Sequence, residues 1–170
     1  MKKFFLGIAA LAIMSCGGNE PATVDADDTT VETPATDDTT DAADENTAVL
    51  VIEGADDMTF NLKELKVKAG QTVKLTLKHV GTMGADAMGH NWILLKSGTD
   101  LQQFAMDAIQ AADNDYIAEA HMGDVIAHTK VIGGGEEVTI EFEAPEAGTY
   151  DFLCSFPGHF ANMQGKFIVE

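Results

Sequence analysis

Two segments in which polar and apolar residues alternate strictly place the strongest constraint on how this chain of 170 residues can fold. In Thr72–Lys78 and again in Glu137–Glu143, every second residue is a large apolar one and the residues between are polar. A period of two residues indicates β-strands with one buried face, the arrangement typical of antiparallel sheets. The side chains expected to point inward are Val73, Leu75, Leu77, Val138, Ile140 and Phe142.

The rest of the chain after Thr47 is also mostly of β type. Short segments rich in β-branched and apolar residues recur between turns, at Thr47–Glu53, Met58–Asn61, Glu64–Lys68, His90–Lys96, Val125–Ile132, Thr149–Cys154 and Lys166–Val169. About eight strands of this kind predict an all-β fold, a Greek-key sandwich or flattened barrel. The exception is Asp100–Ala112, where apolar residues recur at helical spacing and Asp100 or Thr99 can cap the start. We expect one helix there, inserted between strands and packed outside the sandwich.

The N-terminus has the features of an export signal. Residues 1–15 begin with a methionine and two lysines and continue as a short apolar run, too short for a stable membrane span. The run ends in Leu-Ala-Ile-Met-Ser directly before Cys16, and this ending resembles the lipobox of bacterial lipoproteins, in which the cysteine becomes the lipidated N-terminus. We therefore predict a lipoprotein signal peptide, a lipid on Cys16, and anchoring to a membrane of the bacterial envelope on its periplasmic or extracytoplasmic side. The alternative is a plain secretory signal followed by an unrelated cysteine.

Residues 16–46 are predicted to form an acidic linker. From Gly17 to Asn46 the chain has ten acidic residues and no basic or aromatic ones. Such a composition cannot bury enough apolar surface to offset the entropy lost on ordering, so we predict a disordered tether. The domain predicted over residues 47–170 has 18 acidic residues and 8 lysines, a formal charge of −10. This charge argues against binding nucleic acid or anionic lipid headgroups and favours a basic partner.

A thiol, an imidazole and a thioether lie close together near the C-terminus. Four residues separate Cys154 from His159 and three separate His159 from Met163, with the turn-forming pair Pro157-Gly158 between them. A thiolate and an imidazole supply two of the three ligands of a trigonal N₂S set, and a methionine just behind them is expected as the weak axial ligand of a type 1 copper site. The alternative is a C-terminal hairpin with a buried cysteine and a methionine that fills the core.

The missing nitrogen ligand is expected from one of the other four histidines. His90 follows Gly89 at the mouth of an apolar strand, and a period of two places it on the same inward face as Trp92. Gly89 would let the backbone approach closely there. An inward histidine at a strand end needs a polar partner, and a metal ion is a suitable one. Structural roles are expected for the other three, which are His79, His121 and His128.

Three motifs together resemble those of azurin, a family of bacterial blue-copper cupredoxins. They are Met88-Gly-His-Asn-Trp-Ile-Leu, Val125-Ile-Ala-His-Thr-Lys and Cys154-x-Phe-Pro-Gly-His-x-x-x-Met. The resemblance extends from Val49 to Val169 and implies the cupredoxin β-sandwich with one copper ion per chain. It also implies the ligands: His90, Cys154 and His159 in the equatorial plane, Met163 on one axis, and the carbonyl of Gly89 as a distant oxygen on the other.

The same resemblance assigns supporting roles and exposes two departures. Asn91 would brace the ligand loop, and the amides of Asn91 and Phe156 would donate to the sulfur of Cys154. Azurins usually have a disulfide near the N-terminal end, and this chain lacks the cysteine pair for it. Azurins are also typically soluble, whereas this chain has a predicted lipid anchor. The two cysteines, Cys16 and Cys154, could pair in an oxidising compartment, but each already has an expected chemistry of its own.

The function implied by the family is one-electron transfer between respiratory partners outside the cytoplasm, such as c-type cytochromes or other copper proteins, by a monomer. The Pro-Gly pair should bring the ring edge of His159 to an apolar docking patch made of Met83, Met88, Phe160 and Ala161. No open coordination position is implied, so we do not expect an enzyme. The alternative is a copper chaperone or storage protein of the cell envelope, which would favour exposed sites built from methionines alone or from paired cysteines.

Overall fold

The computed structural model describes residues 46–170. The predicted signal peptide, the lipidation site Cys16 and nearly all of the predicted linker lie outside the described residues, so these remain predictions. Within residues 46–170, no helix is both long enough and apolar enough to cross a membrane.

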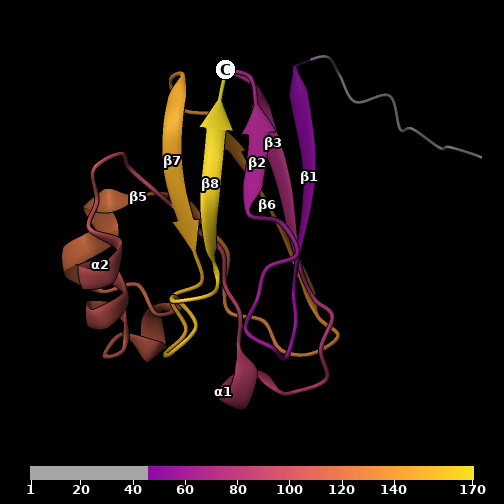
Figure 1. Ribbon diagram of the computed structural model, residues 1–170, viewed down its shortest axis with the longest axis vertical. Helices are drawn as coiled ribbons and strands as arrows, with labels where there is room; N and C mark the ends of the chain where they lie inside the picture. Colours follow the sequence, from indigo (N-terminus) through magenta and orange to yellow (C-terminus); the bar gives the residue numbers. More distant parts are fainter. Residues whose placement is uncertain (1–45) are drawn as a thin grey trace, which may run out of the picture. The chain divides into compact units, whose positions relative to one another are not determined.

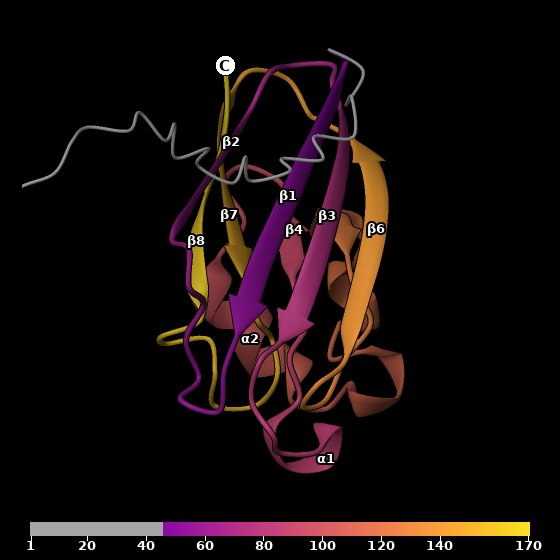
Figure 2. The same cartoon turned by 90° about the vertical axis from the view of Figure 1, so that its right-hand side faces the viewer.

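Two β-sheets pack face to face (Figures 1 and 2). One sheet has three strands, in the order β1 (Thr47–Gly54), β3 (Thr72–His79) and β6 (Glu137–Glu143). The other has five, in the order β2 (Glu64–Val67), β8 (Gln164–Val169), β7 (Gly148–Leu153), β4 (Ile93–Leu95) and β5 (Val125–His128). These strands confirm the predicted all-β sandwich.

Two strand pairs run in a direction that the sequence patterns did not predict. β1 pairs with β3, and β2 with β8, in parallel rather than antiparallel register. The reason is topological: after β1 the chain crosses to the other sheet to form β2, then returns to the first sheet in the direction of β1. The predicted inward residues of β3 are fully buried, and they lie opposite the half-buried inward residues of β6 in the antiparallel pair β3–β6.

Three predicted strand regions are shorter than expected. The segment Met58–Asn61 contributes only a single bridge, between Phe60 and Gly54, because a hydrogen-bonded turn directly precedes it. β4 begins later than expected, at Ile93, and β5 ends earlier, at His128. The residues beyond them, His90 and Ile132, pair in an isolated bridge of their own. This bridge places a predicted ligand at the edge of the regular sheet.

β4 separates two apolar cores. Leu94 faces the larger core between the sheets, whereas Ile93 and Leu95 face a second core beneath helix α2 (Leu101–Ala108). A strand with both faces covered requires a continuous apolar run, and these three residues are all fully buried. The inserted helix therefore packs on the outer face of the five-stranded sheet, as predicted.

Helix α2 begins as predicted and ends early. Asp100 caps it by accepting a hydrogen bond from the backbone N–H of Gln103 at 3.0 Å. The α-helix ends at Ala108, a hydrogen-bonded turn follows it, and a short 3₁₀ segment, η1 (Ala112–Asn114), begins where the predicted helix was expected to end. The predicted single helix is accompanied by a second 3₁₀ segment and by the one-turn helix α1 (Ala85–Met88) in the β3–β4 connection.

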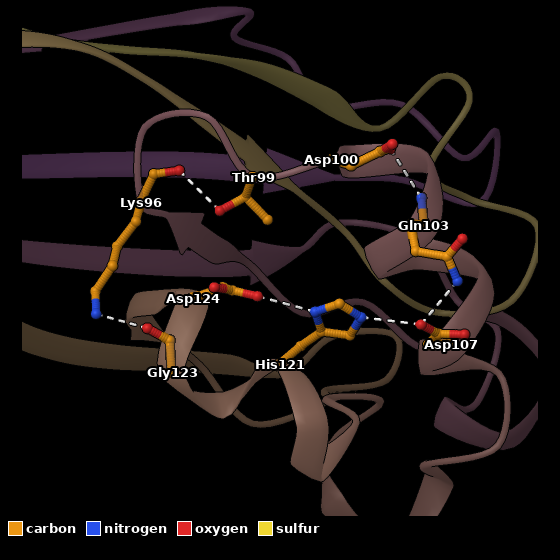
Figure 3. Close-up of polar contacts among 8 residues, drawn as sticks. All are labelled: Lys96, Thr99, Asp100, Gln103, Asp107, His121, Gly123 and Asp124. Atoms are coloured by element: carbon orange, nitrogen blue, oxygen red, sulfur yellow. Dashed lines mark hydrogen bonds and ion pairs between the residues drawn. The ribbon is translucent and has the colours of Figure 1, made fainter.

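The second 3₁₀ segment, η2 (Glu119–Asp124), is tied to α2 by a histidine (Figure 3). The ring of His121 lies 2.9 Å from a carboxylate oxygen of Asp107 on α2 and 2.9 Å from one of Asp124. The ammonium of Lys96 donates to the carbonyl of Gly123 in the same segment. These contacts hold the insertion against the sheet and confirm that His121 is structural.

Several connections meet at one end of the sandwich. The β3–β4 connection, which contains α1 (Ala85–Met88), and the β7–β8 connection both lie at the lower end of Figure 1. The β7–β8 connection contains the predicted C-terminal ligand loop. The fold thus brings together the two segments in which the sequence placed its candidate ligands.

Candidate metal centre

Backbone pairing holds His90 at the end of the sandwich. Its N–H donates to the carbonyl of Ile132 at 3.0 Å, and its carbonyl accepts from the N–H of Ile132 at 2.9 Å. The side chains of His90 and Trp92 are both fully buried, in agreement with the predicted inward face. A Cβ on Gly89 would lie 2.5 Å from the carbonyl oxygen of Ala85, so only glycine allows the backbone to pass here.

Cys154, His159 and Met163 stand on a closed loop that follows β7. The N–H of Cys154 donates to the carbonyl of Met163 at 2.8 Å, and the N–H of Met163 donates to the carbonyl of His159 at 2.9 Å. Gly158 has a φ of 85°, a left-handed conformation that glycine adopts at little cost. The loop turns all three side chains inward, and all three are buried.

Three donor atoms converge in this buried space. Nδ1 of His90 lies 3.2 Å from Nδ1 of His159, and Nδ1 of His159 lies 3.7 Å from Sγ of Cys154. Side-chain donor atoms of the three residues all lie within 4.8 Å of one another. Two nitrogens at about 2.0 Å from one ion in a trigonal arrangement would be roughly 3.5 Å apart, and a nitrogen and a sulfur roughly 3.7 Å apart. The donor set therefore fits one metal ion of the copper type.

Met163 lies beside the ring of His90. A Cβ built on Gly54 would be 2.7 Å from Cδ2 of His90 and 3.1 Å from Cε of Met163. Both side chains therefore contact the backbone of Gly54, at the end of β1, and the thioether of Met163 is fully buried next to the converging donors. Gly54 was not recognised as a site residue from the sequence, where it seemed only to end a strand.

A hydrogen bond orients the imidazole of His90. Its Nε2 lies 3.0 Å from the carbonyl oxygen of Ala55. A carbonyl can only accept, so Nε2 carries the proton and the lone pair of Nδ1 is left for a metal. Such a contact on the remote nitrogen is typical of a metal-binding histidine.

His79, which the sequence suggested was purely structural, is buried beside the centre. Its ring stacks on that of His90, with the centroids 4.2 Å apart. Its Nε2 lies 2.7 Å from the carbonyl oxygen of Met88, and its Nδ1 accepts from the N–H of Gly81 at 3.1 Å. The signal was present in the sequence: His79 continues the inward positions of β3, so a period of two places it inside at the ligand end.

Burial sets the protonation states of the converging groups. It raises the pKa of the Cys154 thiol to about 12, although hydrogen bonds from the amides of Asn91 and Phe156 oppose this rise. It lowers the pKa of His159 to about 4, with repulsion from the neighbouring imidazoles adding to the effect, and it also lowers the pKa of His90. Both imidazoles are therefore neutral near pH 7, the state in which they can bind a metal.

Asn91 connects the two ligand-bearing segments. Its Oδ1 accepts from the N–H of Ser155 at 2.8 Å, and its Nδ2 donates to the hydroxyl of Ser155 at 2.9 Å. Asn91 follows His90 in the chain and Ser155 follows Cys154. The side chain expected to brace the ligand loop is thus bonded to it twice, and Ser155 is a second brace that the sequence did not reveal.

The predicted docking residues differ in their exposure. Met83 is 41% exposed and Ala161 is also exposed, whereas Met88 and Phe160 are half-buried. Phe160 packs against the core beneath α2, so much of its ring is used within the fold. The ring of His159 is only 2% exposed and therefore lies just beneath the surface that it was expected to reach.

Comparison with known proteins identifies the family. Residues 46–170 match the model of the copper-binding proteins of the plastocyanin/azurin family. The chain belongs to this family. The buried cluster of two histidines and a cysteine accordingly fits a single type 1 copper ion, and the two sheets form the cupredoxin fold.

Individual relatives agree with this assignment. Azurin of Achromobacter denitrificans is 46% identical over 119 residues, which cover 67% of this chain and 78% of that protein. Auracyanin A of Chloroflexus aurantiacus, described as a "blue" copper protein, has a solved structure that is 33% identical, with a TM-score of 0.66, over 73% of this chain and 99% of that one. Outer membrane protein H.8 of Neisseria meningitidis serogroup B is 42% identical over 118 residues. Those residues cover 68% of this chain and 63% of H.8, so the chain spans less than two thirds of this relative.

Proposed function

We propose that this protein is a type 1 copper electron carrier with His90, Cys154 and His159 as equatorial ligands. Met163 would be the axial ligand, and the carbonyl of Gly89 a distant oxygen opposite it. The observation that supports this most strongly is the convergence of two Nδ1 atoms and one Sγ atom at 3.2 and 3.7 Å in a fully enclosed space. The bound copper supplies a one-electron redox couple.

The protein's own residues would keep the ligands in place during electron transfer. The ring of His90 is held between the carbonyl of Ala55 and the face of His79. The amides of Asn91 and Phe156 bond to the sulfur of Cys154, where they withdraw charge from a thiolate and so raise the reduction potential. A rigid donor set that changes little between redox states makes electron transfer fast because little reorganisation is needed.

The enclosure of the site favours electron transfer over copper storage or delivery. All four proposed side-chain ligands are buried, and three of them (His90, Cys154 and Met163) are completely unexposed even at the loop end of the sandwich. A chaperone has to pass its metal to another protein by ligand exchange, which requires accessible donors. Electrons can instead leave through a ring that lies just beneath the surface, as that of His159 does. Nothing in this donor set offers a place for a substrate, so we propose a carrier and not an enzyme.

The cellular setting proposed here rests on the N-terminal sequence and the domain charge. Residues 1–15 would be a lipoprotein signal, Cys16 the lipidated residue and residues 16–46 a tether to an envelope membrane. Partners would be respiratory redox proteins, such as c-type cytochromes or other copper proteins, that present a basic face to the domain's charge of −10. They would dock on the surface of Met83, Met88, Phe160 and Ala161, with the domain acting as a monomer.

The visible spectrum of the copper-loaded protein tests the site. Copper(II) should produce an intense blue thiolate charge-transfer band, and Cys154→Ser should abolish it. Met163→Gln should retain copper and lower the reduction potential, while the same change at the exposed Met106 of α2 should leave both spectrum and potential unaltered. A Cys154→Ser protein that remains blue would show that the ligand assignment is wrong.

Membrane fractionation tests the anchor separately. The full-length protein should sediment with membranes, and Cys16→Ser should appear in the soluble fraction or accumulate as an unprocessed precursor. Cys154→Ser is the matched control, because it removes the other cysteine and should still sediment with membranes. Recovery of the unmutated protein entirely in the soluble fraction would contradict lipidation.

A further inference from the structure

We propose that Asp115 and Tyr116, which follow the 3₁₀ segment η1, form a clamp that positions both ligand-bearing segments of the metal centre. In this proposal, which rests on the function proposed above, Asp115 is a positioning residue that acts through the residues next to the ligands. The inserted helical segment would then have a role beyond covering the sheet: it would lock the two halves of the site together.

The backbone of both residues is held in an unfavourable conformation. Asp115 has a φ of 49° and Tyr116 a φ of 57°, both in the left-handed region. Side chains other than glycine, asparagine and aspartate rarely adopt this region, and two such residues in succession are rarer still. A conformation of this kind persists where surrounding contacts require it and is common at functional sites. The contacts of Asp115 and Tyr116 show which parts of the structure require this backbone conformation.

Asp115 holds the segment that carries His90 from two sides. Its backbone carbonyl accepts from Nδ2 of Asn91 at 2.7 Å. Its Oδ1 accepts from the N–H of Val131 at 2.8 Å. Asn91 directly follows His90, and Val131 directly precedes Ile132, whose backbone pairs with that of His90. One residue therefore secures both strands of the bridge that presents the imidazole.

Tyr116 holds the loop that carries Cys154. Its backbone carbonyl accepts from the hydroxyl of Ser155 at 2.7 Å, and its ring packs edge-on against that of Phe156, with the centroids 5.0 Å apart. Phe156 in turn contacts the ring of His159 at 4.8 Å and donates its amide to the sulfur of Cys154. Tyr116 thus contacts the two residues that directly follow Cys154, whereas Asp115 contacts the residue after His90 and the residue before its bridge partner Ile132.

The left-handed conformation explains why one pair can reach both segments. Consecutive residues of the same helical hand direct their carbonyls to the same side, and here both carbonyls are used, one by Asn91 and one by Ser155. Asn91 and Ser155 are also bonded to each other. The result is a closed network in which a shift of Asp115 would move the side-chain amide of Asn91 and, through it, the backbone N–H of Asn91 that donates to the sulfur of Cys154.

Substitutions at Asp115 can distinguish the effect of its carboxylate from the effect of its left-handed backbone conformation. Asp115→Gly keeps the left-handed backbone accessible and removes the bond to Val131, whereas Asp115→Asn keeps both an acceptor and a residue that tolerates this conformation. Asp113→Asn is the matched control, because Asp113 is exposed and its replacement removes the same charge from the same segment. Ser155→Ala removes the bond to Tyr116 and tests the other arm of the clamp, even if Asp115→Gly does not fold.

The first measurement uses the metal-free protein. Amide hydrogen exchange at Val131, Ser155 and His90 should be accelerated about 10-fold or more by Asp115→Gly, while amides of the β3–β6 pair remain protected. Asp115→Asn and Asp113→Asn should match the parent. Unchanged exchange at these amides in both Asp115→Gly and Ser155→Ala would overturn the clamp, and this result does not depend on which metal the site binds.

The second measurement uses the copper-loaded protein. Asp115→Gly and Ser155→Ala should lose copper to a chelator about 10-fold faster than the parent and shift the thiolate charge-transfer band, and Asp115→Asn should restore parental behaviour. Parental copper loss and an unshifted band in both loosened variants would overturn the positioning role. If the parent itself gave no blue band, the proposed function would fail, and the exchange data would still decide whether the clamp exists.

Discussion

His79 lies face to face with His90: their imidazole rings are 4.2 Å apart between centroids and 15° from parallel. His79 is itself fixed at both nitrogens, by the carbonyl of Met88 and the amide of Gly81. A backbone N–H can only donate, so Nδ1 of His79 is the acceptor and Nε2 carries the proton. The fixed ring of His79 therefore prevents the ring of His90 from rotating away from the donors opposite it.

Replacing His79 should therefore cost stability without removing the metal. We expect His79→Leu to lower the free energy of unfolding of the metal-free protein by about 1–3 kcal/mol, because it removes the partner of two partly buried backbone groups, the carbonyl of Met88 and the N–H of Gly81. The blue band should persist, since His79 is not a proposed ligand. His128→Leu is the matched control, because within residues 46–170 the ring of His128 makes one long polar contact, at 3.4 Å to the carbonyl of Thr129. Chemical denaturation measures both, and equal losses would contradict the buried role of His79.

Gly54 offers a test of how tightly the site is enclosed. A methyl group there would come within 2.7 Å of Cδ2 of His90 and 3.1 Å of Cε of Met163, so both side chains would have to move. We expect Gly54→Ala to destabilise the protein by about 1–3 kcal/mol and to shift the charge-transfer band. Gly84→Ala is the control, since a Cβ at Gly84 meets nothing within 4 Å. Denaturation curves and visible spectra that were unchanged in Gly54→Ala would mean that Met163 and His90 are not packed as described.

Much of this arrangement could be predicted from the sequence because local patterns carry it. The alternation in β3 and β6, the spacing of the Cys154 loop and the inward position of His90 all follow from the geometry of one strand or one turn. The parallel pairing of β1 with β3 could not be predicted in this way, because it depends on the crossing of the chain to the other sheet and back.

The parts of the site that the sequence did not reveal are those made by distant segments. Gly54 ends one strand and Asp115 follows a 3₁₀ turn, and neither has a motif around it that points to a metal. Their roles arise because the topology places them against His90 and against its neighbour Asn91. A pattern in one segment says which way a side chain points, but it does not say which backbone it will meet.

His121 should make the stability of the α2 insertion depend on pH. Hydrogen bonds that the ring donates to Asp124, and then to Asp107, raise the pKa of His121 above its ordinary value of 6.5 (Figure 3). Below pH 6.5 the ring is charged in the folded and unfolded chain alike, so the ion pairs contribute fully. As the pH rises through the raised folded pKa the ring loses its proton, and this contribution to the free energy of unfolding disappears.

The measurement is the pH dependence of unfolding between about pH 5.5 and 8.5, the range in which histidine titrates. Stability should fall across this range in the parent and fall less in His121→Gln, with the difference between them largest at the acidic end. Asp107→Asn should reduce the slope in part, because Asp124 still pairs with the ring. A His121→Gln protein with the same slope as the parent would show that another group is responsible. The effect should weaken in high salt, since both carboxylate side chains are partly exposed, at 44% and 43%.

The last prediction concerns how electrons leave, where charge and contact act at different ranges. The domain's charge of −10 should attract a basic partner over roughly a Debye length, about 8 Å at physiological salt, so it should govern the rate of association. The apolar side chains of the proposed docking surface (Met83, Met88, Phe160 and Ala161) act only at contact and should govern the productive complex. Among them Met83 is the better target for mutation. It is 41% exposed, whereas the backbone of the half-buried Met88 is bonded to His79.

Stopped-flow mixing of the reduced copper protein with a basic c-type cytochrome, over a series of salt concentrations, can separate the two effects. Higher ionic strength should slow transfer in the parent. Met83→Lys should slow transfer at every salt concentration and leave the copper spectrum unchanged, because the new ammonium group would have to be desolvated at the contact. Met106→Lys, which adds the same charge at an exposed methionine on α2, should retain the parental rate within the small change expected from net charge. At high salt, electrostatic attraction between the partners is screened. If Met83→Lys transferred electrons as fast as Met106→Lys under these conditions, electrons would not leave through the proposed docking surface.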